Sequence, residues 1–254
     1  RWAPEDARYL GEVEDDEMTV PNHDEWDEVA EQFGVDLEQV RRDHLISHVL
    51  AALTRDPGPD RLIFFGGTAL ARTYLPDARL SEDIDLISRG PRSAIANNIQ
   101  ASVRRGLARS HGRPEWRPAL SATSGSQAAV LQIEGVASIQ VQLVGGDGYS
   151  WPTEVRDIDQ RYSDAPAARL RTLTAAGFAA AKLSAWMDRG APRDLYDLWA
   201  LAERGLVDRE ALEVFIRLGP HARPPTSRVF ATAPDEGAWR VALGHQTRLR
   251  VTAS

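Results

Sequence analysis

The chain has 254 residues, of which 43% are hydrophobic, and it contains no cysteine. This length and composition are typical of a folded protein with one large domain or two small ones. The absence of cysteine excludes disulfides, thiolate metal sites and a cysteine nucleophile, so any metal must be bound by oxygen or imidazole. No run of 18 apolar residues and no basic-then-apolar start occurs, so we expect a cytoplasmic protein without a membrane partner.

Charge is distributed unevenly along the chain, whose net value is -7. Residues 1–40 hold 14 acidic residues and 2 arginines, whereas the remaining positions hold 23 acidic and 28 basic residues. The body of the chain is therefore mildly basic, and a nucleic-acid partner is not excluded. Lys182 is the single lysine among 30 basic residues.

The first predicted elements surround a glycine pair. Residues 1–34 are expected to be an acidic leader that is loosely docked at most, and residues 35–53 show the apolar period of a helix. Residues 62–65 form a short apolar run that predicts a buried strand, which Gly66 and Gly67 interrupt. Thr68 is expected to cap a short helix that ends near Pro76. A second strand is then predicted over residues 81–87.

The later elements change from mixed to helical. We expect a helix over residues 91–108, strands over 128–133 and 138–144, and helices over 174–189, 193–204 and 209–217. The predicted fold class is therefore α/β (α+β), with a mixed-sheet core at residues 35–150 and a helical C-terminal domain at residues 151–254.

Two carboxylates are predicted to share one face of the second strand. Asp83 and Asp85 stand at i and i+2, so their side chains project together and repel each other unless a cation lies between them. Magnesium uses one or two protein carboxylates and completes its shell with water and substrate phosphate. The pair is therefore a candidate Mg²⁺ site. The alternative is that Asp83-Ile84-Asp85 belongs to an edge strand whose polar side faces solvent.

The glycine turn supplies a second candidate feature. Gly66, Gly67 and Thr68 lie between a strand and a helix, where a phosphate is able to approach the backbone and meet free amides. An ordinary strand-to-helix turn is the alternative for these residues alone. A phosphate-binding turn followed by a metal-binding strand is a stronger indication of a nucleotide site than either motif alone.

These segments resemble a known family. Phe65-Gly66-Gly67-Thr68-Ala69-Leu70 and Arg79-Leu80-Ser81-Glu82-Asp83-Ile84-Asp85-Leu86 are similar to the first motif of the AbiEii/AbiGii nucleotidyltransferase toxins. This family includes the MenT-like toxins and belongs to the DNA polymerase beta-like nucleotidyltransferase superfamily. A second stretch of this chain is also similar to the family. It consists of Ala181-Lys182-Leu183-Ser184-Ala185, Arg189 and Arg193-Asp194-Leu195-Tyr196-Asp197-Leu198. The resemblance covers about residues 35 to 205 and implies a polymerase beta-like nucleotidyltransferase core.

The resemblance implies roles for particular residues. By it, Asp83 and Asp85 bind the metal; Gly66, Gly67, Thr68, Ser81 and Arg193 bind the nucleotide; Lys182 completes the site with Asp194 or Asp197. An amine in a cleft stabilises charge that develops on a triphosphate, although a lone lysine on a helix surface is the plain alternative for Lys182. A carboxylate at the start of a helix is favoured without any catalytic task, so Asp197 ranks above Asp194 for chemistry.

One departure from the superfamily pattern concerns the third carboxylate. Polymerase beta-like enzymes commonly place it on a later strand, where this chain has Gln140 and Gln142. A glutamine cannot act as a general base, so hydroxyl activation falls to the metal or to the Asp194/Asp197 pair, or activity is low. Glu134 is a poorer substitute because it lies in a predicted turn.

Other candidate sites carry weaker signals. Arg104, Arg105, Arg109, Arg113 and Arg117 form a basic stretch that suits an RNA backbone and suits a solvated surface equally well. The six histidines show no spacing that we would assign to a metal site.

The implied reaction is transfer of a nucleoside monophosphate from a nucleoside triphosphate to RNA. The resemblance implies a toxin that modifies the 3′ end of tRNA and is paired with a cognate antitoxin protein. Two alternatives remain open: a nucleotidyltransferase that modifies a protein hydroxyl, and a catalytically degenerate, nucleotide-binding regulatory protein.

Overall fold

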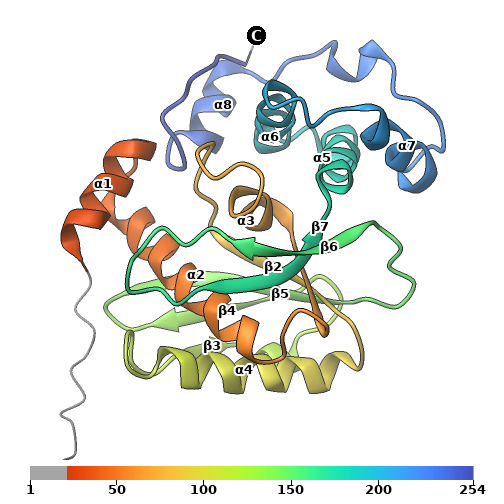
Figure 1. Ribbon diagram of the computed structural model, residues 1–254. Helices are drawn as coiled ribbons and strands as arrows, with labels where there is room; N and C mark the ends of the chain where they lie inside the picture. Colours follow the sequence, from red (N-terminus) through yellow and green to blue (C-terminus); the bar gives the residue numbers. More distant parts are fainter. Residues whose placement is uncertain (1–21, 254) are drawn as a thin grey trace, which may run out of the picture.

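A computed structural model describes residues 22–253 and contains one seven-stranded mixed sheet (Figure 1). The strand order is β3-β4-β5-β2-β1-β7-β6. At the centre of the sheet, β1 runs antiparallel to β2 and parallel to β7, while β2 runs parallel to β5. The strands are β1 (Leu62–Phe65), β2 (Asp83–Ser88), β3 (Glu115–Arg117), β4 (Ala128–Ile133), β5 (Ala137–Gly145), β6 (Thr153–Ile158) and β7 (Ala168–Leu173).

Two long helices, α2 (Leu37–Arg55) and α4 (Arg92–Leu107), pack against each other and against the sheet (Figure 1). The Asp36 side chain caps α2 by accepting a hydrogen bond from the backbone amide of Gln39, which satisfies an otherwise unpaired donor. Ile84 and Leu86 of β2 are fully buried in the main apolar core together with residues of both helices. This packing leaves the other face of β2 free to carry polar side chains.

Helices α3 and α5 to α8 lie above the sheet in Figure 1, whereas α1 lies at the left beside α2. Thr174 caps α5 through the amide of Gly177, and Gly190 ends it in the left-handed conformation with φ 59°. Pro192 starts α6, where its missing N–H costs nothing. The helices are α1 (His23–Phe33), α3 (Gly66–Ala71), α5 (Ala175–Arg189), α6 (Pro192–Glu203), α7 (Arg209–Leu218) and α8 (Glu236–Leu243), with 3₁₀ turns at Leu120–Ala122 and Ser227–Phe230.

The α/β class and the mixed sheet are confirmed, and three local predictions need correction. Residues 153–173 form β6 and β7, so helical structure begins at Ala175 and not at residue 151. Part of the predicted leader forms α1, whose Trp26, Val29 and Phe33 are buried against α2; residues 1–21 lie outside the described chain. Thr68 does not cap α3, because this helix already begins at Gly66. Within residues 22–253, no helix is both long enough and apolar enough to cross a membrane.

Candidate active site

The two aspartates lie on the face of β2 opposite its buried apolar residues. Asp83 and Asp85 are partly buried, and Asp85 stands beside Phe65, the last residue of β1. Burial and the charge of Asp83 raise the pKa of Asp85 to about 6, and burial together with Glu82 raises the pKa of Asp83. Two desolvated carboxylates that disfavour ionisation fit a divalent cation, because the cation removes their repulsion.

The glycine pair leaves room for the side chains of Asp85, Arg79 and Ser81. Gly66 has φ +80°, and a Cβ there would lie 2.1 Å from Oδ2 of Asp85. A Cβ at Gly67 would lie 2.8 Å from a guanidinium nitrogen of Arg79 and 3.0 Å from the Ser81 hydroxyl. The Thr68 hydroxyl donates a hydrogen bond to the backbone carbonyl of Asp83. The Gly66-Gly67-Thr68 turn is therefore packed directly onto β2, the strand that carries Asp83 and Asp85.

Lys182 reaches the site from the third turn of α5 and contacts two acidic partners. Its Nζ lies 3.1 Å from Oδ1 of Asp194 and 2.7 Å from Oδ2 of Asp197. Arg189 forms a bidentate pair with Asp194, with Nε 2.7 Å from Oδ2 and a terminal nitrogen 3.0 Å from Oδ1. The break between α5 and α6 thus brings Lys182 and Arg189 to the same carboxylate.

Asp197 is bound from the opposite side by a residue that precedes β2. Arg79 donates from Nε and from a terminal nitrogen to the two oxygens of Asp197, each at 2.8 Å. Burial raises the pKa of Asp197, but the charges of Arg79 and Lys182 outweigh it and lower the pKa to about 2. With a relative exposure of 2%, Asp197 acts as a fixed counter-charge that positions the lysine.

The C-terminal segment braces the approach to β2. The side-chain carbonyl of Gln246 accepts a hydrogen bond from Arg79 at 2.8 Å, and its backbone carbonyl accepts one from the amide of Leu80 at 2.8 Å. The Thr247 hydroxyl donates to the carbonyl of Ala78 at 2.7 Å. This segment, which we call the C-terminal brace (residues 246–247), was not predicted from the sequence.

A cleft of about 290 Å³ opens between these elements. The residues that surround it come from β1, α3, β2, β5, β7, α5 and α6, and they include Gly66, Gly67, Asp85, Gln142, Lys182, Arg189 and Asp194. Arg193 is exposed on the first turn of α6. Its positive charge opposes, without cancelling, the rise in the pKa values of Asp83 and Asp85. Five of the predicted site residues therefore line one cleft: Gly66, Gly67, Asp85, Lys182 and Asp194. The other five do not line it: Thr68, Ser81, Asp83, Arg193 and Asp197.

The neighbouring strand carries no acid at the matching positions. In the parallel register of β2 and β5, Asp83 pairs with Gln140 and Asp85 with Gln142. Gln142 lines the cleft and donates a hydrogen bond to the carbonyl of Ser126. The two glutamines thus stand beside the aspartates, while Glu134 is exposed in the turn that joins β4 to β5.

Comparison with known proteins decides the family. Residues 48–248 match the family described as nucleotidyl transferase AbiEii toxin, type IV toxin–antitoxin system. The chain belongs to the AbiEii family. It is therefore a toxin nucleotidyltransferase, and its family implies a nucleotide substrate, a divalent metal and an antitoxin partner. No curated protein sequence matches the chain significantly.

Comparison with solved structures concerns the fold alone. MenT4, a nucleotidyltransferase toxin from Mycobacterium tuberculosis H37Rv, superposes with a TM-score of 0.65 at 21% sequence identity, covering 90% of this chain and 84% of MenT4. An antigenic nucleotidyltransferase-like protein from Paracoccidioides brasiliensis gives a TM-score of 0.40 at 14% identity, covering 75% of this chain and 98% of that protein. The likeness to MenT4 supports the overall fold.

Proposed function

We propose that this AbiEii protein uses Mg²⁺ to transfer a nucleoside monophosphate from a nucleoside triphosphate to RNA, with the 3′ end of tRNA as the acceptor. The observation that carries the proposal is the convergence of Asp85, the Gly66-Gly67 turn and Lys182 on one cleft. Nucleotide transfer needs a cation at the phosphates, a turn that lets them approach and a fixed positive charge nearby, and the residues of this cleft fit all three needs.

The residues divide the work of binding and charge neutralisation. Asp83 and Asp85 would hold Mg²⁺, which when bound supplies positive charge to the triphosphate. Lys182 has three donors, of which Asp194 and Asp197 take two, so one remains for a phosphate oxygen. Because both aspartates are almost fully buried, the ammonium group is held in one place before the substrate arrives.

The transfer itself is a single displacement at phosphorus. The acceptor hydroxyl oxygen forms a bond to the α-phosphorus, the bond to the bridging oxygen breaks, pyrophosphate leaves and the hydroxyl proton passes to solvent. Gln142 cannot take that proton, so we assign the rate to positioning and charge stabilisation in the cleft. Arg193 and Arg189 stand at the mouth, with Arg189 60% exposed, and are able to meet the departing phosphates.

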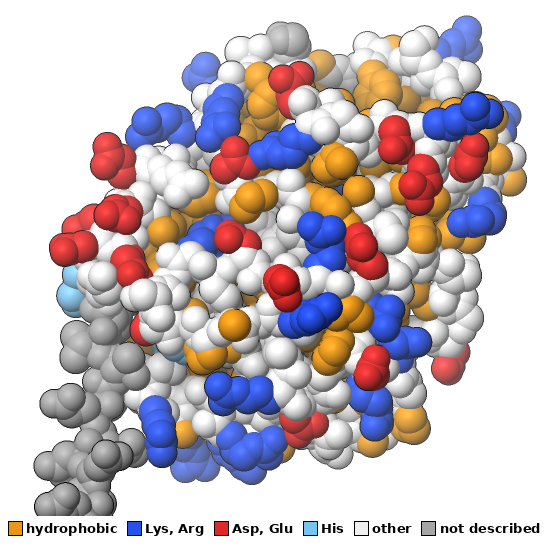
Figure 2. All heavy atoms as spheres, viewed as in Figure 1, with side chains coloured by type: hydrophobic (Ala, Val, Ile, Leu, Met, Phe, Trp, Pro, Cys, Tyr) orange, Lys and Arg blue, Asp and Glu red, His pale blue; other side chains and the backbone are white. Residues whose placement is uncertain are grey.

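An RNA acceptor is supported by the basic stretch from the end of α4 to β3. Its five arginines are all exposed, and Figure 2 shows basic side chains gathered along the lower edge of the molecule, where α4 runs in Figure 1. Arg105 pairs with Asp56 and Arg117 with Glu115 in exposed ion pairs, which contribute little to stability. RNA phosphates are able to replace such partners at low cost.

The test is incubation of the purified protein with Mg²⁺, each labelled nucleoside triphosphate and total tRNA. We expect label on RNA with the wild type and none with Asp83→Asn or Lys182→Ala, provided that circular dichroism shows both variants folded. Label on protein alone would favour the protein-hydroxyl acceptor, and no label at all would favour a regulatory role.

A charge-reversal comparison tests the RNA surface separately. The triple variant Arg104→Glu, Arg105→Glu and Arg113→Glu should weaken RNA labelling strongly, because each reversal repels phosphate. Arg209→Glu is the matched control, since this arginine is 91% exposed on α7, away from the basic stretch. Equal labelling by the triple variant and the control would contradict an RNA path across α4.

A further inference from the structure

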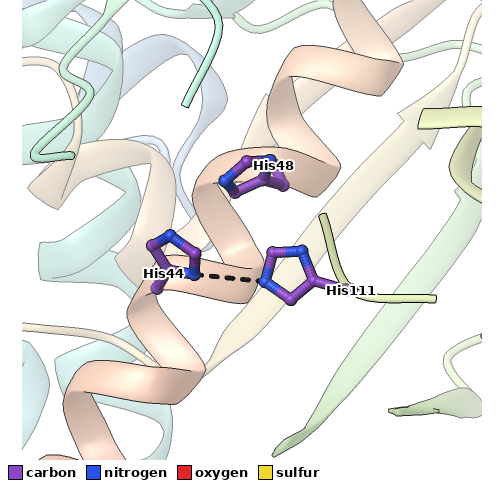
Figure 3. A group of neighbouring side chains, drawn as sticks. All are labelled: His44, His48 and His111. Carbon is purple, nitrogen blue, oxygen red and sulfur yellow. Dashed lines mark hydrogen bonds between the residues drawn. The ribbon is translucent and has the colours of Figure 1, made fainter. Parts of the chain in front are cut away.

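Three histidines from distant parts of the sequence meet beside α2 (Figure 3). His44 and His48 project from α2, and His111 projects from the loop between α4 and β3. One ring nitrogen of each lies within 4.8 Å of the others. The sequence analysis assigned no metal spacing to the histidines; the structure corrects this, because positions i and i+4 share one helix face.

The polar contacts of the cluster orient the rings. Asp164, in the loop between β6 and β7, accepts from Nε2 of His44 at 3.0 Å and from Nε2 of His48 at 3.3 Å. A proton held on Nε2 leaves Nδ1 of each ring as the nitrogen with a free lone pair. Nδ1 of His44 faces Nε2 of His111 at 3.1 Å. Ligand nitrogens about 2.0–2.1 Å from a tetrahedral zinc ion lie about 3.3 Å apart.

Burial makes the cluster suited to a cation ligand set. The side chains of His44 and His48 are 3% and 5% exposed, and the Asp164 side chain is 8% exposed. Neutral imidazole is the form that binds metal, and three imidazoles favour zinc over magnesium.

We propose that His44, His48 and His111 bind a zinc ion, with Asp164 as the outer carboxylate that orients two of the ligands. A carboxylate that accepts the second N–H of a metal-bound histidine fixes the ring and strengthens the ligand. For zinc to bind, the proton on Nε2 of His111 moves to Nδ1 of the same ring, which then donates to the Ser110 hydroxyl 2.8 Å away. The ring stays neutral, and Nδ1 of His44 and Nε2 of His111 both offer lone pairs to the ion.

This zinc site is distinct from the nucleotide cleft. Its residues come from α2 and from two loops that do not line the cleft described above. Bound zinc would fasten the loop before β3 and the loop between β6 and β7 to α2. It would thereby hold in place the middle of the basic stretch, in which His111 lies between Arg109 and Arg113.

Zinc content and affinity test the proposal without any activity measurement. The wild type, purified with zinc in the medium and dialysed against Mg²⁺, should retain one zinc per chain by elemental analysis. His111→Ala should bind zinc more than about 100-fold more weakly, and Asp164→Asn about 10–100-fold more weakly. His221→Ala is the matched control, because His221 is exposed and lies outside the cluster.

Two further measurements separate this site from the carboxylate pair and from misfolding. Asp83→Asn should retain its zinc, since the proposed ligands are all imidazoles. X-ray absorption at the zinc edge of the wild type should report nitrogen ligands, a readout that needs no variant. A wild type without stoichiometric zinc, or His111→Ala with unchanged zinc affinity, would overturn the assignment.

Discussion

Replacing Gly66 by alanine should disable the enzyme without unfolding it. The new Cβ would lie 2.1 Å from Oδ2 and 3.1 Å from Cβ of Asp85, so the carboxylate must move. A shift of about 1 Å in a reacting group costs about 100-fold in rate. The left-handed backbone at φ +80° adds a stability cost of about 1–2 kcal/mol. We therefore expect kcat/KM for nucleotide transfer to fall by about 100-fold or more.

Gly135 offers a control with the same backbone strain and no clash. It has φ +72° in the turn between β4 and β5, and a Cβ there would meet no atom within 4 Å. Gly135→Ala should lose similar stability in urea denaturation while its kcat/KM stays near that of the wild type. If Gly66→Ala were as active as Gly135→Ala, the contact between the turn and Asp85 would have no role in catalysis, and the reasoning would be refuted.

Two further substitutions test the electrostatics of the cleft. Asp85→Asn should abolish transfer yet raise the melting temperature of the metal-free protein at pH 7.5, because a pKa raised to about 6 destabilises the ionised form; the gain should vanish below pH 4. Asp197→Asn should lower the free energy of unfolding by about 3–5 kcal/mol, since Arg79 and Lys182 lose a buried partner. With a pKa lowered to about 2, the stability from Asp197 is complete above pH 4 and is lost as the pH falls towards 2, so urea midpoints of this variant and the wild type should converge there.

The centre of the sheet and the shared face of the two aspartates were predictable because their signals are local. Alternation along β2 placed Asp83 and Asp85 on one face, and the apolar run before Gly66 predicted β1. The sequence also shows that glutamines stand where a third carboxylate is expected, at Gln140 and Gln142. The register of β5 with β2 places these glutamines beside the aspartates.

Elements with weak local patterns were missed. The strand β7 carries Arg169 and Arg171 between buried residues, and its pairing with β1 joins distant parts of the chain, so periodicity alone does not reveal it. The helix α1 could have been predicted from the helical spacing of Trp26, Val29 and Phe33. The many acidic residues between them mask that spacing.

Contacts between distant positions were beyond the reach of one sequence. Arg79 and Asp197 are 118 positions apart, and neither neighbourhood indicates the other. The spacing of His44 and His48 was a readable signal for a metal site. Only the fold shows that His111 and Asp164 complete it, because they approach from two separate loops.

The C-terminal brace makes the geometry of the cleft depend on residues far along the chain from the carboxylate pair. Thr247 holds Ala78 across 169 positions, and Gln246 supports the arginine that binds Asp197. The arginine that fixes Asp197, and through it Lys182, therefore relies on a segment that follows α8.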